Sequence, residues 1–247
     1  MVQRLRESRS IEERLREAEH LSGLGQLSRT MAHEIRNPLN FINLSIGYIE
    51  DKYRPTEAED AEKFTRLTSG MKHEVQRLNQ LVTDFLDYSR PIKFNLQKVR
   101  VNPMLDDVLA LVWAKAEADG IQIIREFDHC DVTVEVDPAL FKSCILNVIV
   151  NAFNSMSEGK KDSSVLRLIS DLSDNDYLLT ITDNGVGLSQ ELISKVFEPF
   201  FSTKQNHPGL GLPMTRRVME ELGGRVEFHS VEGDGCSVRL FLPCPCE

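Results

Sequence analysis

Apolar side chains in residues 1–90 recur with the spacing of an α-helix, and glycine and proline are sparse there. Two rows with a seven-residue repeat run along this region: Ile35, Ile42 and Ile49, and beside them Leu39, Ile46 and Tyr53. Pro55 then interrupts the pattern, because proline removes a helical hydrogen bond and clashes with the preceding turn. The pattern therefore predicts a long amphipathic helix that ends before Pro55.

A second helix is predicted over residues 57–88. Its apolar positions again repeat every seven residues: Phe64, Met71, Leu78 and Phe85, with Leu67, Leu81 and Tyr88 beside them. Two long helices with a short connection favour an antiparallel helical hairpin. One hairpin has a single apolar seam and little to bury it against. We therefore expect two copies to pair as a four-helix bundle, which makes the protein a homodimer.

The pattern changes after Pro91, where short β-type segments alternate with helical ones. The predicted strands cover residues 93–99, 122–127, 132–136, 165–171, 177–183, 225–230 and 237–242. The predicted helices cover residues 103–118, 139–157, 190–196 and 210–222, the last of them stopped by Gly223 and Gly224. This order favours an α/β sandwich of the α+β class over a doubly wound sheet.

Three parts of the chain follow from these patterns. Residues 1–20 carry charges of both signs and are interpreted as a lead-in helix, either an ordinary exposed helix or the end of a coiled coil. Residues 21–90 form the predicted helical domain, and residues 91–247 form the predicted α/β domain.

The composition is that of a globular protein: of 247 residues, 41% are hydrophobic and 27% are charged. A net charge of -9 without a basic stripe argues against nucleic-acid binding. No run of eighteen apolar residues and no apolar leader core occurs, so a cytoplasmic location is expected, with a membrane reached only through an upstream region. Five cysteines with scattered spacing favour reduced thiols; a zinc site at Cys244 and Cys246 lacks further ligands nearby.

His33 has a carboxylate and an amide close to it in the predicted helix. On an ideal helix His33 lies roughly 160–200° from most of the apolar stripe, so its imidazole is expected to face solvent. A neutral imidazole nitrogen is a nucleophile near pH 7, and a neighbouring carboxylate such as Glu34 can orient the ring through its other N–H. Asn37 lies one turn further on nearly the same face, and Pro38 is expected to kink the helix.

Two later segments carry polar groups that could bind an exocyclic amine or a magnesium-bound phosphate. Asn147 and Asn151 lie one turn apart on a predicted helix, and an amide carbonyl of this kind can bind magnesium. Asp183 follows a predicted strand, and its carboxylate can accept a hydrogen bond from an exocyclic amine. Gly185 and Gly187 permit unusual backbone angles and a close ligand approach.

Two further segments suit phosphate. Residues 197–204 place Phe200 and Lys204 in an aromatic-rich stretch whose lysine supplies a point charge. The run Gly209-Leu210-Gly211-Leu212 opens a helix, where backbone N–H groups face anions. Each of the four segments is weak alone, but all four in this order after a histidine-bearing helix are a strong signal.

The run His33-Glu34-Ile35-Arg36-Asn37-Pro38-Leu39 resembles the H box of the histidine-kinase dimerisation and phosphotransfer domain, most closely that of nitrogen-regulator-like sensor kinases. The four later segments resemble the N box, first glycine box, F box and second glycine box of the histidine-kinase ATPase domain, which has the Bergerat fold of the GHKL superfamily. Together the resemblance covers roughly residues 20–243.

This resemblance implies roles for the first group of residues. His33 is implied to be the phosphoacceptor and Glu34 its acid/base partner. Asn37 is implied to position water when the same protein dephosphorylates its partner. The implied function is that of a two-component sensor histidine kinase: ATP-dependent autophosphorylation of His33, followed by transfer to an aspartate of a response regulator receiver domain.

The resemblance also implies a nucleotide site for ATP and Mg2+. Asn151 is implied to hold magnesium, Asn147 to assist at the phosphates and Asp183 to recognise the adenine amino group. The glycines are implied to line the base pocket (Gly185 and Gly187) and to contact phosphates (Gly209 and Gly211, with Leu210 and Leu212 in the same box). Residues 200–208 resemble the ATP lid, which contains Phe200 and Lys204.

Two positions depart from the wider superfamily pattern. His207 and Pro208 stand where a glycine and a small residue are common, and Pro208 offers no N–H to a phosphate. Asn147 stands where related ATPases carry a glutamate base for water, so ATP is expected to await His33 as the nucleophile.

Two other functions stay open at this point: a dimeric scaffold that binds nucleotide without transfer, and a GHKL serine kinase or ATPase. The joint near residues 89–91 is expected to let the ATP domain swing, and the regulator is expected to dock on residues 40–49 and 70–85.

Overall fold

The computed structural model describes residues 34–127, 132–159, 163–173, 176–203 and 208–244. The chain divides into two compact units, Met1–Pro91 and Ile92–Glu247. Each unit is described by itself below.

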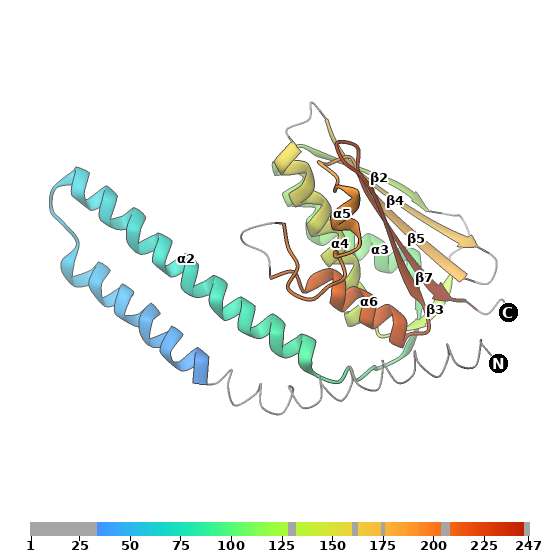
Figure 1. The fold of residues 1–247 in the computed structure, drawn as a ribbon, viewed down its shortest axis with the longest axis horizontal. Helices are drawn as coiled ribbons and strands as arrows, with labels where there is room; N and C mark the ends of the chain where they lie inside the picture. The colour runs from blue at the N-terminus through green and yellow to red at the C-terminus, as the bar shows by residue number, and fades with distance from the viewer. Residues whose placement is uncertain (1–33, 128–131, 160–162, 174–175, 204–207, 245–247) are drawn as a thin grey trace. The chain divides into compact units, whose positions relative to one another are not determined.

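The first unit is a helical hairpin (Figure 1). Residues 34–53 are helical, residues 54–57 form the connection, and helix α2 spans Ala58–Ser89. The two helices run antiparallel. Arg36 near the start of the first donates from Nη2 to Oγ1 of Thr83 near the end of α2, at 3.1 Å. Glu50 near the end of the first pairs with Lys72 in the middle of α2. The predicted helical hairpin is therefore confirmed.

The seam inside the hairpin uses only part of the predicted apolar rows. In the described part of this unit the buried apolar cluster consists of Leu39, Ile46 and Val75. Val75 was not among the predicted row positions of α2, and two of those positions, Met71 and Leu78, stay 55% and 37% exposed. The reason is geometric: the seven-residue spacing shows that a helix is amphipathic, but the rotation of the helix decides which flank meets its neighbour.

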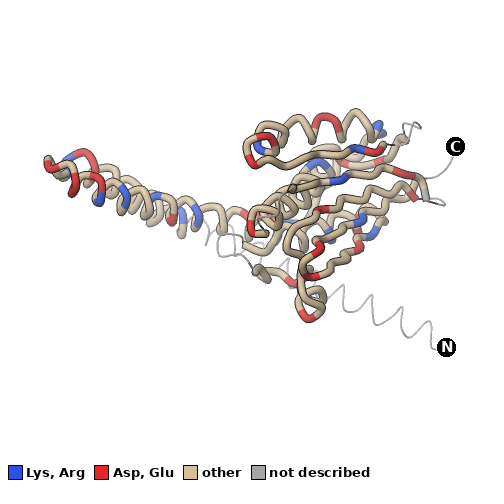
Figure 2. The backbone as a smooth tube through the Cα atoms, turned by 90° about the horizontal axis from the view of Figure 1, so that it is seen from above, with Lys and Arg blue, Asp and Glu red and all other residues tan. Residues whose placement is uncertain are grey.

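A second apolar flank of the hairpin stays open. Large exposed fractions, 43%, 44% and 42%, remain in one predicted row: Ile35, Ile42 and Ile49. Acidic and basic residues are interspersed along both helices (Figure 2). The row of Ile35, Ile42 and Ile49 is therefore an open apolar flank on a hairpin that also carries mixed charge.

The second unit is an α/β structure whose elements follow in this order: β1 Gln97–Arg100, α3 Val101–Ala118, β2 Ile121–Phe127, β3 Thr133–Val136, α4 Pro138–Gly159, β4 Ser164–Ser173, β5 Asp176–Asp183, α5 Gln190–Ile193, α6 Gly211–Glu221, β6 Arg225–Val231 and β7 Gly235–Pro243. A five-stranded sheet has the order β2-β4-β5-β7-β6, with β2 and β4 parallel and the other pairs antiparallel. A two-stranded sheet pairs β1 with β3.

Helices α3, α4 and α6 cover one face of the five-stranded sheet (Figure 1), so the expected two-layer α/β sandwich is confirmed. Alternate residues of β5 point into this core, as the strict alternation of half-buried and buried positions shows. Helix α4 packs its apolar face there through Phe141, Ile145 and Ile149, all with exposed fractions of 0%. Among the described helices, α4 alone is long and apolar enough to cross a membrane, and its packing against the sheet is that of a core helix.

Two predicted elements were too long. The strand predicted from residue 93 begins only at Gln97, because its partner β3 ends at Val136, where helix α4 begins. The helix predicted over residues 190–196 ends at Ile193, and the chain continues in a tighter turn in which the N–H of Lys195 bonds to the carbonyl of Leu192.

The predicted stop of α6 has the expected chemistry. Gly223 adopts a positive φ of 76°. The N–H of Gly224 donates to the carbonyl of Met219 at 2.8 Å. This is the Schellman arrangement, in which a glycine in the left-handed region closes the helix.

Candidate functional site

Glu34 and Asn37 lie on the exposed side of the first helix of the hairpin. His33, the predicted phosphoacceptor, lies outside the described residues. Leu44 and Tyr48 follow Asn37 at intervals that place all three within roughly 40° on a helix. Their side chains are 73% and 58% exposed, so large apolar groups lie on the same face as Asn37. Residues 40–49 were predicted to contact the regulator, but Leu44 and Tyr48 were not singled out.

Helix α4 carries the two predicted amides. Asn147 and Asn151 are half-buried, one turn apart, at the flank of the apolar face that packs against the sheet. The start of α6 lies against Asn147: a Cβ on Gly211 would lie 3.5 Å from Asn147 Cγ. The structure therefore brings the predicted N box and second glycine box together, with a helix N-terminus beside a side-chain amide.

Asp183 ends strand β5 and is buried, with an exposed fraction of 7%. Its Oδ1 accepts a hydrogen bond of 2.8 Å from the N–H of Gly185. Gly185 in turn lies directly against α4, because a Cβ there would fall 2.1 Å from Ser155 Oγ. The N–H of Val186 also donates to the carbonyl of Ser155, at 3.3 Å.

Ser155 lies one turn beyond Asn151 on α4. The contact of Ser155 with Gly185 therefore brings the loop after Asp183 to the same part of α4 as the two amides. Sequence reasoning missed Ser155, because a serine in the last turns of a helix gives no signal of a long-range contact.

The hairpin between β6 and β7 holds the other side of this loop. Gly187 has a φ of 65°, and a Cβ there would lie 2.0 Å from the carbonyl oxygen of Val231. The N–H of Gly233 donates to the carbonyl of Val186 at 2.7 Å, and the N–H of Leu188 donates to Ser230 Oγ at 2.8 Å. Ser230 and Gly233 were also missed by sequence reasoning, since their contact with the loop is formed only by the fold.

Asn184, between Asp183 and Gly185, has a structural role. Its Oδ1 accepts from the N–H of Val165 at 2.9 Å, and its Nδ2 donates to the carbonyl of Ser163 at 2.8 Å. The amide therefore fastens the loop to the start of β4.

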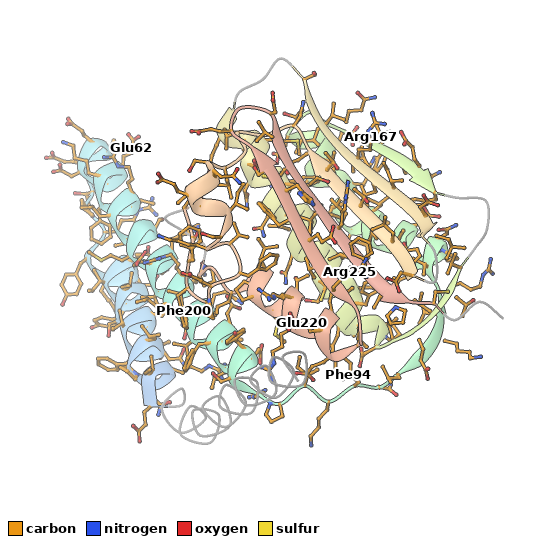
Figure 3. The ribbon with its side chains drawn as sticks, turned by 45° about the vertical axis from the view of Figure 1, so that its right-hand side comes forward. Glu62, Phe94, Arg167, Phe200, Glu220 and Arg225 are labelled. Carbon is orange, nitrogen blue, oxygen red and sulfur yellow. The ribbon has the colours of Figure 1, made fainter. Side chains whose placement is uncertain are left out.

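The predicted F box contains two phenylalanines with different environments. Phe197 lies edge-on to Phe228 of β6, with ring centroids 6.4 Å apart, and the guanidinium of Arg216 lies 5.3 Å from its ring centroid. Phe200, on the segment between α5 and α6, is 57% exposed and has a φ of 67° (Figure 3). Phe197, which was not among the predicted site residues, therefore anchors the segment.

The ends of the predicted lid are tied together. The N–H of Phe200 donates to the carbonyl of Gly209 at 3.2 Å. Gly209 has a φ of 69°, and a Cβ there would lie 2.3 Å from the carbonyl oxygen of Phe201, so only glycine fits. Lys204 and His207 lie outside the described residues, and Pro208 is half-buried.

Two leucines complete the second glycine box. Leu210 is buried and occupies the N-cap position of α6, and Leu212 is half-buried in its first turn. Both leucines therefore pack the helix start, while the backbone N–H groups of this turn remain the groups suited to an anion.

The donor set fits a nucleotide with its metal. Among the described residues no cluster of three or more His, Cys, Asp and Glu side chains is present. A magnesium ion here would take its ligands mainly from phosphate and water oxygens and from an amide such as that of Asn151. The described cysteines, Cys144, Cys236 and Cys244, are free thiols. Cys246 of the candidate zinc pair lies outside the described residues.

Two protein families match this chain. Residues 24–92 match the His Kinase A (phospho-acceptor) domain, and residues 136–245 match the histidine kinase-, DNA gyrase B-, and HSP90-like ATPase. The chain is 31% identical to the signal transduction histidine-protein kinase AtoS of Escherichia coli over 93% of its own length and 36% of AtoS. It is 29% identical to the sensor histidine kinase ZraS of Salmonella typhi over 96% of its length and 50% of ZraS. It thus spans half or less of these relatives.

Solved structures agree with these matches. Histidine kinase ThkA in complex with response regulator protein TrrA has a TM-score of 0.67 and 25% identity, over 95% of this chain and 66% of that one. Full-length ShkA in complex with AMPPNP shares the fold, with a TM-score of 0.71 and 22% identity over 90% of this chain and 46% of that one. The chain therefore belongs to the sensor histidine kinases and carries their catalytic core, a phosphoacceptor helical domain followed by a GHKL-type ATPase domain.

Proposed function

We propose that this core uses ATP to phosphorylate His33 and then transfers the phosphoryl group to an aspartate of a response regulator receiver domain. The observation that carries the proposal is the convergence on α4: Asn147 meets the start of α6, and Ser155 holds the loop that follows Asp183. Relatives named as sensor histidine kinases support it, as does the ThkA complex with its regulator.

The proposed chemistry is mainly one of positioning. The buried Asp183 is assigned to the adenine amino group and the α6 N-terminus to the phosphates. Mg2+ bound with Asn151 would offset the phosphate charge. Asn147 cannot take a proton from water as a carboxylate does, so the nucleotide persists until His33 attacks in line.

Glu34 is assigned as the base that orients and activates His33, and Asn37 as the residue that positions water when the phosphorylated regulator is hydrolysed. Both side chains are exposed on the hairpin, where a partner protein can reach them. We further propose a cytoplasmic location, where ATP and receiver domains are found.

A homodimer is part of the proposal. The row of Ile35, Ile42 and Ile49 keeps more than 40% of each side chain exposed, and full burial of such a side chain contributes about 1.5–3 kcal/mol. Pairing two hairpins through this flank completes a four-helix bundle. Ile42→Glu should give a monomer in light scattering, whereas Asn40→Glu, on the opposite side of the helix, should stay dimeric. A dimeric Ile42→Glu protein would contradict the assigned flank.

The regulator is assigned to the face that carries Asn37, Leu44 and Tyr48. These two apolar side chains lie opposite the dimer flank, so the two surfaces do not compete. Leu44→Ala should slow transfer to a receiver domain and leave labelling of His33 unchanged.

The experiment that tests the function uses γ-labelled ATP and the purified chain. Acid-labile label on the wild type and none on His33→Gln is expected, while His73→Gln, a matched change at an exposed histidine of α2, should label normally. Binding of nucleotide without label would favour a scaffold. Acid-stable label, or fast hydrolysis by His33→Gln, would favour a serine kinase or an ATPase.

A further inference from the structure

The carboxylate of Asp137 holds two segments that are far apart in the sequence. Asp137 immediately precedes α4 and is buried, with an exposed fraction of 8%. Its Oδ1 accepts hydrogen bonds from the N–H groups of Ala139 and Leu140, at 3.0 and 3.1 Å. This is an N-cap, and Pro138 in the first helical position lacks the N–H that would otherwise need a partner.

The second oxygen of the same carboxylate reaches the segment that leads from the hairpin into β1. Oδ2 of Asp137 accepts a hydrogen bond of 2.9 Å from the backbone N–H of Asn95. The antiparallel ladder of β1 and β3 ends at the pair Gln97 and Val136, because the next residue, Asp137, turns into α4. The Asp137 side chain therefore continues, toward the linker, a pairing that the backbone can no longer make.

The bond to Asn95 is a strong one. It lowers the pKa of Asp137 more than either single bond from α4 does. A hydrogen bond to an ionised carboxylate is roughly twice as strong as one between neutral groups. The segment before β1 is thus held to the start of α4 by a charge-assisted, partly buried hydrogen bond.

This bond fixes the chain at Asn95, six residues after the last residue of α2. At the hairpin side the fixed point is Ser89, buried with an exposed fraction of 1%, whose Oγ donates to the carbonyl of Phe85. Fully extended, the chain from Ser89 to Asn95 spans at most about 21 Å, whereas the chain from Ser89 to Gln97 spans about 28 Å. Release of Asn95 therefore lengthens the joint by about a third.

We infer that Asp137 is a positioning residue for phosphorylation of His33: by joining the linker at Asn95 to the start of α4, it fixes how the nucleotide-binding helix is tethered to the histidine-bearing hairpin. The inference rests on the proposed function. Helix α4 carries Asn147 and Asn151, so one carboxylate anchors both the tether and the helix that meets the phosphates. Reaction rates are sensitive to such placement, since a misplacement of about 1 Å can cost about 100-fold.

The test separates the tether from the helix cap. Asn95→Pro removes the linker N–H and leaves the cap on α4 intact, whereas Asn95→Ala keeps that N–H and is the matched control. Asp137→Ser keeps a good N-cap oxygen and is too short to reach Asn95 as well. Each variant of the full chain is assayed for AMPPNP affinity by calorimetry and for the rate of acid-labile labelling at saturating ATP.

Asn95→Pro and Asp137→Ser are expected to bind AMPPNP within about twofold of the wild type but to label His33 about fivefold more slowly or worse. Asn95→Ala is expected to match the wild type in both assays. Labelling by Asn95→Pro within twofold of Asn95→Ala, or faster, would overturn the inference. So would a loss of AMPPNP affinity equal to the loss of rate, since Asp137 would then act only on the fold. If the wild type itself gives no acid-labile label, the proposed function fails instead.

Discussion

A single methyl group added at Gly185 is expected to weaken ATP binding while the protein stays folded. The Cβ of Gly185→Ala would lie 2.7 Å from the backbone carbonyl carbon of Ser155 and 2.8 Å from Asp183 Oδ1. Carbon atoms normally pack at about 3.5–4.0 Å, so the shortfall against α4 is about 1 Å. The hydroxyl of Ser155, at 2.1 Å, can rotate away, but the backbone of a buried helix cannot.

The loop must therefore move away from α4, and it carries the N–H of Gly185 off Asp183. Overpacking of this kind costs about 1–3 kcal/mol. If ATP binding requires the original loop position, the dissociation constant rises about 5-fold to about 140-fold, since each 1.4 kcal/mol is a factor of ten. The measurement is calorimetric titration with AMPPNP, next to thermal unfolding of the same samples.

Gly120→Ala is the matched control. Gly120 has a φ of 67° but nothing within 4 Å of its added Cβ. Alanine there strains the backbone by about 1–2 kcal/mol without touching the loop. This control should unfold at a lower temperature and bind AMPPNP normally. If Gly185→Ala bound AMPPNP within twofold of Gly120→Ala, the steric reasoning would be refuted.

Three further outcomes are expected. Hydrogen bonds from the N–H of Asn95 and from the start of α4 hold the pKa of Asp137 below its ordinary value of 3.8, so the stability they give above about pH 4 is lost as the pH falls through the lower native pKa. In urea unfolding, the free energy of Asp137→Asn should therefore change less with pH in this range than that of the wild type. An equal pH dependence in the two proteins would contradict this. Thr215 is 0% exposed, and among the described residues its hydroxyl has no hydrogen-bond partner of normal geometry. In urea unfolding, Thr215→Val should therefore be as stable as the wild type or more stable by about 1 kcal/mol. A loss of about 1 kcal/mol would show that the hydroxyl stabilises the fold. Burial raises the pKa of the Cys144 thiol to about 12. Iodoacetamide at pH 8 should therefore alkylate Cys144 far more slowly than the half-buried Cys236, as measured by peptide mass spectrometry. Similar alkylation rates would show that Cys144 is not buried.

The elements of this protein could be predicted where their signal is local. The repeat of apolar residues in the hairpin, the stop at Gly223 and the alternation in β5 each depend on near neighbours in the chain. The face that each helix presents does not. Val75 rather than Met71 closes the hairpin seam, because the rotation of two packed helices follows from all their contacts at once.

The same distinction holds for the candidate site. Asn147, Asp183 and Gly185 could be named from motifs, since the residue types and spacing are characteristic. The residues that join those motifs, such as Ser155 and Ser230, give no comparable signal. Their partners come from segments that only the folded sheet brings together, so their roles follow from the structure alone.

The small seam of the hairpin has a consequence for control of the protein. The buried apolar cluster of the described hairpin contains three side chains, whereas that of the second unit contains more than twenty. The resistance of the molecule to rearrangement is therefore distributed unevenly. We therefore expect rearrangement to begin among the helices of the hairpin, while the second unit keeps its packed core.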